Sequence, residues 1–281
     1  MNETMEQKRE RRHQEDLRRL RNFRPIDDTF MRGLFKENLP LAQFVLRIIT
    51  GKPDLVLTTC ETQADMKRVT GARSICLDAY ATDSTGKKYD IEVQRADNGA
   101  DPHRARYHSS VMDVENLDEK QDYRELPDTY VIFITEKDYY KAGKPVYVIQ
   151  NMNLTLEQPF GDGAHILYVN GEYRDDSDIG RLMHDFNCTD AADMNFPILA
   201  EKTRYLKENP RGVSEMCKAM EDLRTESLAE GRAEGRAEGR EEQAQITARN
   251  LYMQGLPIEQ IARAIGFSVA TVEQWLTPKA V

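Results

Sequence analysis

Two acidic side chains on neighbouring predicted strands are the residues of this sequence best suited to chemistry. Asp78 lies in the otherwise apolar run Ser74–Ala81, and Glu92 lies in Lys88–Gln94. The polar turn at residues 83–86 between the two runs predicts a β-hairpin. A hairpin brings one carboxylate from each strand to one point, and such oxygen ligands suit Mg²⁺ or Mn²⁺. A bound ion of this kind lowers the pKa of a water molecule and polarises a phosphate ester.

The second predicted strand has a strict alternation. It places Asp90, Glu92 and Gln94 on one face, opposite Tyr89, Ile91 and Val93. The pattern alone also fits an ordinary hairpin with a solvated polar face, and without further information it favours that interpretation. Asp90 is then a polar flank, with a role as an auxiliary metal ligand as the alternative.

The remaining periodicity predicts a mixed α/β domain. A helical stripe from Leu41 to Ile49 ends at the stop signals Gly51 and Pro53. The other predicted elements are a helix over Pro102–Leu117, strands over Thr129–Ile134, Val146–Ile149 and His165–Val169, and helices over Asp178–Phe186 and within Phe196–Leu223, where Pro210 and Gly212 interrupt the pattern.

Residues 229–242 contain a four-residue Ala-Glu-Gly-Arg repeat. On a helix, residues four apart stack, so this segment gains no ion pairs of its own between Glu and Arg. Each of its glycines costs a helix roughly 1 kcal/mol relative to alanine. The pattern leaves two interpretations open: a flexible linker, or a helix that a second copy of the chain stabilises to form a dimer.

The C-terminal residues have the pattern of a helix-turn-helix, Ile-Ala-x-x-x-Gly-x-Ser-x-x-x-Val, from Ile261 to Val272. Gly266 is placed to end one helix and Ser268 to cap the next. Thr271 and Gln274 are the candidate DNA-binding residues of this unit. The alternative is a three-helix packing module that does not contact DNA, since the exposed positions carry no Arg or Lys.

Composition excludes several classes of protein. The formal net charge is −9, which argues against a protein that coats nucleic acid by bulk electrostatics. No apolar run is long enough to span a membrane, and the charged N-terminus has no signal-peptide core. Four scattered cysteines without metal-finger spacing predict reduced thiols and a cytoplasmic location. His165, His184 and Asp185 have no partner at ligand spacing and are expected to be structural.

Asp78 followed by Glu92-Val93-Gln94 resembles the signature of PD-(D/E)XK nucleases. Residues 25–190 more specifically resemble the PD-(D/E)XK transposases, also called the recombination-promoting nuclease family. The supporting stretches are residues 27–35, 77–87, 91–95, 104–108 and 130–134. The resemblance implies a restriction-endonuclease-like mixed sheet flanked by helices. A helical C-terminal extension with a helix-turn-helix-like end is expected to follow this α/β domain.

The resemblance also implies roles for individual residues. Asp78 and Glu92 are the expected metal ligands, and Asp28 matches an N-terminal acidic position that holds or orients the metal shell. Gln94 stands where the family usually has a catalytic Lys, so it offers hydrogen bonds in place of a positive charge. The residues expected to contact DNA phosphates next to this site are Arg95, Arg104 and Arg106.

The function expected from these residues is Mg²⁺- or Mn²⁺-dependent DNA cleavage. The alternative is a catalytically weak or inactive DNA-binding or regulatory protein that keeps the nuclease fold, as Gln94 and the acidic composition suggest. The expected segments are a charged helical arm (1–22), a nuclease-like domain (23–175), a helical extension (176–228), the repeat (229–242) and a helix-turn-helix-like unit (243–281).

Overall fold

The structure is a computed structural model that describes residues 4–66, 75–95 and 97–277. The chain forms two compact units, Met1–Met220 and Glu221–Val281. We describe each unit by itself.

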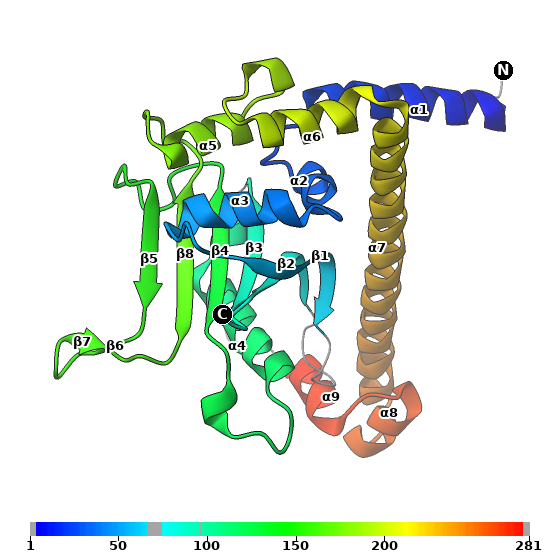
Figure 1. Cartoon of the computed structure of the whole chain (residues 1–281). Helices are drawn as coiled ribbons and strands as arrows, with labels where there is room; N and C mark the ends of the chain where they lie inside the picture. Colours follow the sequence, from blue (N-terminus) through cyan, green and yellow to red (C-terminus); the bar gives the residue numbers. More distant parts are fainter. Residues whose placement is uncertain (1–3, 67–74, 96, 278–281) are drawn as a thin grey trace. The chain divides into compact units, whose positions relative to one another are not determined.

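A six-stranded mixed sheet forms the centre of the first unit, in the order β1-β2-β3-β4-β8-β5 (Figure 1). β1, β2 and β3 are antiparallel to one another, β3, β4 and β8 are parallel, and β5 is antiparallel to β8. The strands are β1 (Leu57–Met66), β2 (Ile75–Asp83), β3 (Lys88–Gln94), β4 (Thr129–Thr135), β5 (Val146–Gln150) and β8 (Ala164–Asn170), and a separate hairpin pairs β6 (Met152–Asn153) with β7 (Gln158–Pro159).

The predicted strands are confirmed, except that Ser74 lies outside the described residues. β1 is a strand that the sequence analysis missed. Its residues 58–63 are polar apart from Cys60 and are mostly exposed, because β1 is an edge strand. It therefore lacks the apolar run by which the inner strands are recognised.

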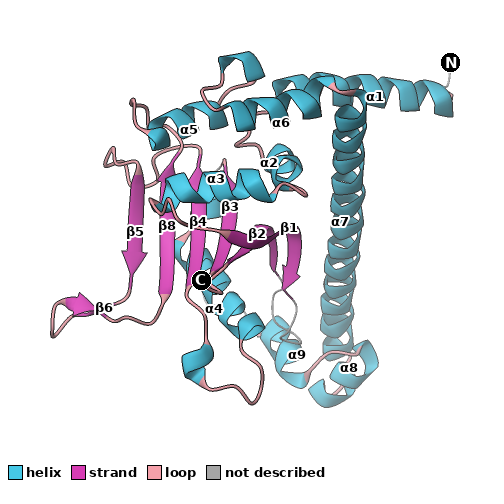
Figure 2. Ribbon diagram, in the orientation of Figure 1, coloured by secondary structure: helices cyan, strands magenta, loops and turns pink. Residues whose placement is uncertain are grey.

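Helices cover both faces of the sheet, and Figure 2 shows α3 and α4 on opposite sides of it. One face packs on a core that includes Phe30, Leu46 and Phe186, and the other on a smaller core that includes Met112 and Phe133. The helices of this unit are α1 (Met5–Asn22), α2 (Asp28–Phe35), α3 (Leu39–Thr50), α4 (Pro102–Asn116), α5 (Asp178–Phe186), α6 (Pro197–Glu208) and the start of α7 (Pro210–Met253).

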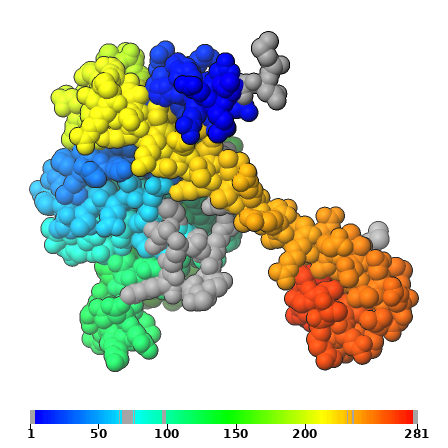
Figure 3. All heavy atoms as spheres, turned by 90° about the vertical axis from the view of Figure 1, so that its right-hand side faces the viewer, coloured from blue at the N-terminus to red at the C-terminus, as the bar shows by residue number. Residues whose placement is uncertain are grey.

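The charged N-terminal arm is helical, as predicted. Figure 3 shows this helix in blue against the yellow residues of α6 and the start of α7. Lys207 of α6 connects the end of α1 to the rest of the first unit, because its ammonium group donates to the carbonyl oxygens of Arg21 and Phe23. Only Asp16 and Leu20 of α1 are buried, so most of the helix surface faces solvent.

The second unit begins within α7 and continues through α8 (Ile258–Ile265) and α9 (Val269–Leu276). Its core contains Ala248, Ile261, Ala262 and Val272. The predicted turn is confirmed, because Gly266 ends α8 at a φ of 74° and the Ser268 hydroxyl accepts from the N–H of Thr271.

One boundary in this region differs from the prediction. The helix-turn-helix-like unit was expected to begin at residue 243, but no helix begins there, because α7 runs without a break from Pro210 to Met253 and includes the repeat. The helix continues through the three glycines of the repeat. A Cβ atom added at any of these three positions would meet nothing within 4 Å. The other predicted segment boundaries stay predictions.

Candidate active site

Asp78 and Glu92 meet where β2 and β3 separate. The paired register of the two strands runs from Thr82 opposite Lys88 to Ala79 opposite Ile91. At the next position the N–H of Asp78 donates to Oε1 of Glu92, at 3.0 Å. The Glu92 carboxylate thus takes the place of a main-chain acceptor, and the local backbone sets its position.

The polar face of β3 is buried. Asp78 is 5% exposed, Glu92 is 1% exposed and Asp90 is completely buried. The alternation predicted for this strand is correct, but the interpretation of its polar face as solvated is wrong. Helix α4 packs against the central strands and its Arg104 and His108 contact Glu92 and Asp90, which removes these carboxylates from water.

Arg32 of α2 joins Asp78 to Asp28. Its Nη2 lies 2.8 Å from Oδ1 of Asp78, and its Nε lies 2.7 Å from Oδ1 of Asp28. Helical spacing sets the second contact, because residues 28 and 32 are four apart on α2. Asp28 therefore reaches the site through an arginine that the sequence analysis did not single out.

Arg104 of α4 makes the corresponding contact with Glu92, with its Nη2 3.0 Å from Oε2. The side chain of Arg104 is 41% exposed, so its guanidinium connects the buried carboxylate to solvent. Arg104 was expected to contact phosphates, and its place at the mouth of the site is compatible with that role.

Burial raises the pKa values of both central carboxyl groups to about 8. For Asp78 the largest cause is loss of hydration, followed by the charges of Glu92 and Asp28. For Glu92 burial again comes first, followed by the charge of Asp90. Carboxyl groups whose pKa values rise in this way are characteristic of sites that bind a cation or move a proton.

Gln94 follows Glu92 on the same strand and packs on the backbone at Gly99. A Cβ atom at position 99 would collide with Oε1 and Cδ of Gln94. Gly99 belongs to the short 3₁₀ turn Asp97–Ala100 after β3. This turn therefore positions the side chain of Gln94.

The other two arginines expected at this site have different surroundings. Arg95 lies 3.1 Å from Asp27 and 3.4 Å from Glu136, so two carboxylates balance its charge. Arg106 is exposed on α4, two residues beyond Arg104. Their contact with DNA stays a prediction.

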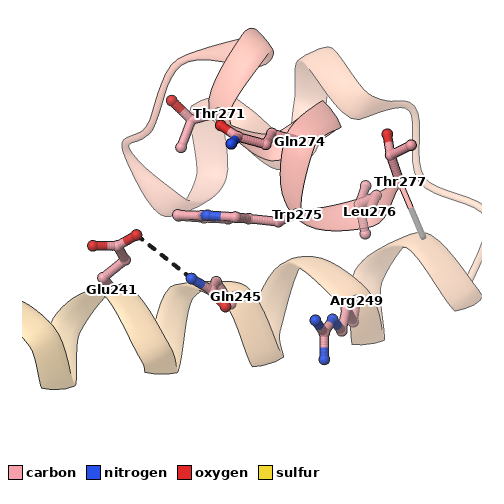
Figure 4. A pocket seen from close by; sticks show the side chains of 8 residues that line it. All are labelled: Glu241, Gln245, Arg249, Thr271, Gln274, Trp275, Leu276 and Thr277. Carbon is pink, nitrogen blue, oxygen red and sulfur yellow. Dashed lines mark hydrogen bonds between the residues drawn. The ribbon is translucent and has the colours of Figure 1, made fainter. Parts of the chain in front are cut away.

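The two candidate DNA-binding residues of the second unit line a groove between α7 and α9 (Figure 4). The flat face of the Trp275 indole spans this groove above Gln245. The Thr271 hydroxyl lies 2.6 Å from the Ser268 hydroxyl, so it takes part in capping α9, while Gln274 is exposed. Of the two, Gln274 is the more available for DNA.

A second cluster corrects the expectation that His184 and Asp185 lack partners. Ligand-type atoms of His184, Asp185 and Cys188 all lie within 4.8 Å of one another. Cys188 follows the end of α5, and its thiol contacts the carbonyl oxygen of His184. Asp185 accepts from the N–H groups of Asn195 and Phe196, which gives this buried carboxylate a structural role. His165 stacks on Tyr130, as expected of a structural histidine.

The donor set of the site fits a divalent cation. Asp78, Asp90 and Glu92 are all buried. Ligand-type atoms of Asp90 and Glu92 lie within 4.8 Å of one another and of His108, and Asp78 contacts Glu92 through its N–H group. Oδ1 of Asp90 has no hydrogen-bond partner within the described residues. Oxygen donors of this kind suit Mg²⁺ or Mn²⁺.

A mixed sheet with helices on both faces, and with two buried carboxylates where its antiparallel strands separate, is consistent with the PD-(D/E)XK class. Residues 41–173 match the family described as PD-(D/E)XK nuclease family transposase. The matched residues include Asp78 and Glu92, so the family resemblance found in the sequence is confirmed for this part of the chain, and so is the expected fold.

Residues 244–277 match a second family, described as Putative ATPase subunit of terminase (gpP-like). This match spans the end of α7 and helices α8 and α9. No curated protein and no solved structure matches the chain. None of the described helices has the length and apolar composition to cross a bilayer.

Proposed function

We propose that this chain is a divalent-metal-dependent DNA endonuclease of the recombination-promoting type, which hydrolyses phosphodiester bonds. The observation that carries the proposal is the meeting of Asp78 and Glu92 at the separation of β2 and β3. Family membership supports a nuclease or transposase-like function for this domain. A transposase-like role and a DNA substrate follow from the same membership.

Asp78 and Glu92 would hold the ion, which supplies charge stabilisation and a more acidic water molecule when bound. Gln94 would orient the attacking water or the phosphate by hydrogen bonds. Arg32 and Arg104 balance the carboxylates in the absence of the ion. Once released from Asp78 and Glu92, the two guanidinium groups would pair with phosphate oxygens, while Arg32 keeps its contact with Asp28.

DNA would contact Arg104 at the mouth of the site, the exposed Arg106 of α4, and Arg95, which directly follows Gln94 in the sequence. The helix-turn-helix-like unit, through Gln274 and Thr271, is the proposed second contact. From the terminase match we take only the helical form of this unit and propose no ATPase activity. Dimerisation through the repeat and a cytoplasmic location also remain proposals.

One observation favours a second candidate function, a DNA-binding protein with little or no cleavage activity. Gln94 supplies no positive charge where negative charge develops in the transition state. Arginines already pair with both expected metal ligands. A catalytically weak protein would keep the fold and the DNA contacts and lose only the rate.

Plasmid nicking by the full-length chain tests the proposal. We expect Mg²⁺ or Mn²⁺ to support nicking, EDTA to stop it, and Asp78→Asn and Glu92→Gln to reduce the rate by at least about 10²-fold. Asp101→Asn is the matched control, because it also removes one negative charge while asparagine keeps the cap of α4. Nicking that survives either site variant would refute the assignment. DNA binding without metal-dependent nicking would support the second candidate.

A further inference from the structure

A row of side chains crosses one face of the sheet, from the candidate site to the edge strand β5. The strand register places Glu92 of β3 opposite Phe133 of β4, and Phe133 opposite Tyr168 of β8. Tyr168 in turn lies opposite Tyr147 of β5. Paired residues share a face and neighbouring strands lie about 4.8 Å apart, so the row extends about 14 Å from Glu92. The mechanism above uses none of its three aromatic members.

Tyr140 lies at the end of this row, on the loop between β4 and β5. The centroid of its ring is 4.9 Å from that of Tyr147 and 5.3 Å from that of Tyr168. The ring of Tyr139 completes the cluster, at 5.1 Å from Tyr140. Three neighbouring rings therefore hold Tyr140 in place, while 41% of the residue stays exposed. An aromatic ring that is both held and exposed can stack on another flat ring.

Hydrogen bonds within the loop hold the backbone around Tyr140. The carboxylate of Asp138 accepts from the N–H groups of Lys141 and Gly143. The hydroxyl of Tyr147 donates to the same carboxylate, at 2.8 Å, and accepts from two further N–H groups of the loop. Because the loop is already ordered, a ligand that binds to it loses little conformational entropy.

The charges next to Tyr140 suit a polyanion. Lys141 and Lys144 are exposed on the same loop, and neither ammonium group takes part in an ion pair within the described residues. The two carboxylates of the loop are already paired, Asp138 with N–H groups and Glu136 with two arginines. Proteins bind single-stranded nucleic acid through this combination, in which aromatic rings stack on bases and cationic side chains contact phosphates.

We propose that Tyr140 stacks on an unpaired base of the DNA substrate, with Lys141 and Lys144 at the neighbouring phosphates, so that the substrate is DNA with a single-stranded segment beside the cleaved bond. This inference rests on the proposed function for the cleavage itself. Both faces of a base within a duplex are covered by its neighbours, so only an unpaired base can offer a face to Tyr140. A separation of about 14 Å corresponds to about four nucleotides at the rise of one DNA strand.

Binding of labelled oligonucleotides to the full-length chain in EDTA, followed by fluorescence anisotropy, tests the proposal separately from cleavage. The two probes are a single-stranded DNA and the duplex of the same sequence. Tyr140→Ala should weaken binding of the single strand by about 10-fold and leave binding of the duplex unchanged. Tyr140→Phe keeps the ring and should bind both probes as the wild type does. Tyr123→Ala is the matched control, because it also removes an exposed tyrosine ring, from the segment that precedes β4.

Unchanged affinity of Tyr140→Ala for the single strand would overturn the inference, and so would an equal loss for the duplex or an equal loss in Tyr123→Ala. Cleavage gives a second readout, because with Mg²⁺ a duplex that carries a single-stranded flap should be nicked faster than the plain duplex. Tyr140→Ala should abolish that preference. If DNA is nicked but Tyr140→Ala changes neither binding nor preference, only the stacking site is wrong. If the single-strand loss is found and no DNA is nicked, the nuclease function is wrong and the stacking site stands.

Discussion

The N–H group of Asp78 donates to Oε1 of Glu92 at 3.0 Å, across the point where β2 and β3 stop pairing. The main chain of Asp78, one expected metal ligand, therefore holds the carboxylate of Glu92, the other expected ligand. The N–H group of Val93 in turn donates to Oδ2 of Asp78, at 3.4 Å. Both carboxylates are thus held by main-chain donors and need little rearrangement to bind a cation. Such preorganisation is a common source of catalytic power.

Replacing Gln94 by lysine should maintain or raise the nicking rate. Lysine places a positive charge where negative charge develops, and the same position carries lysine in the family signature that this chain resembles. Initial rates of plasmid nicking at saturating Mg²⁺ measure the effect. A large loss would show that the glutamine amide has a specific role.

Gly99→Ala should lower the nicking rate by about 10-fold or more, because the new methyl group displaces the side chain of Gln94. Gly235→Ala is the matched control, since a Cβ atom there meets nothing within 4 Å and alanine favours the helix. Rates and thermal melts of both variants are compared with those of the wild type. Equal nicking rates for Gly99→Ala and the wild type would show that the position of Gln94 is unimportant.

The metal-free protein should lose stability as the pH rises from about 5 to about 8. Burial raises the pKa values of Asp78 and Glu92 to about 8, so in this range the folded chain holds protons that the unfolded chain has released. The free energy of unfolding therefore decreases with increasing pH across this window. Thermal melts in EDTA measure the trend.

Added Mg²⁺ should reverse this loss, because the cation binds the ionised carboxylates and its stabilising effect grows with pH. Glu92→Gln removes one of the two titrating groups and should flatten both trends. A metal-free melting temperature that rises between about pH 5 and about pH 8 would contradict the raised pKa values.

The Ala-Glu-Gly-Arg repeat predicts a dimer whose association weakens as the salt concentration rises. Glu230, Glu234 and Glu238 of one chain are expected to face Arg232, Arg236 and Arg240 of the other. Exposed ion pairs contribute only about 0–1 kcal/mol each and are screened by salt. Sedimentation equilibrium of the full-length chain at low and high ionic strength tests this.

Arg236→Glu provides the comparison within the repeat. Reversal of one charge in each chain should shift the equilibrium toward monomers at low salt, while Lys8→Glu in α1, outside the repeat, should not. A mass that stays monomeric at every ionic strength would leave α7 as a plain spacer helix.

Local chemistry in the sequence was sufficient to predict most of the secondary structure. The bounds of β3 and α5 agree with the expected ranges, since strict alternation, capping residues and glycine stops act over a few residues. Gly266 and Ser268 are examples, because each acts on a backbone within three residues of itself. The pairing of Asp78 with Glu92 was also predictable, since a short hairpin joins their strands.

Only the tertiary structure decided which side chains pair with the buried carboxylates and balance their charges. Arg32 is 46 residues from Asp78, and its contact depends on how α2 packs on the sheet. His108 and Asp90 are 18 residues apart and meet because α4 covers the polar face of β3. Whether that face was solvated or buried could not be read from its alternation. Burial depends on long-range packing, and burial sets the pKa values and the unpartnered oxygen that give these carboxylates their chemistry.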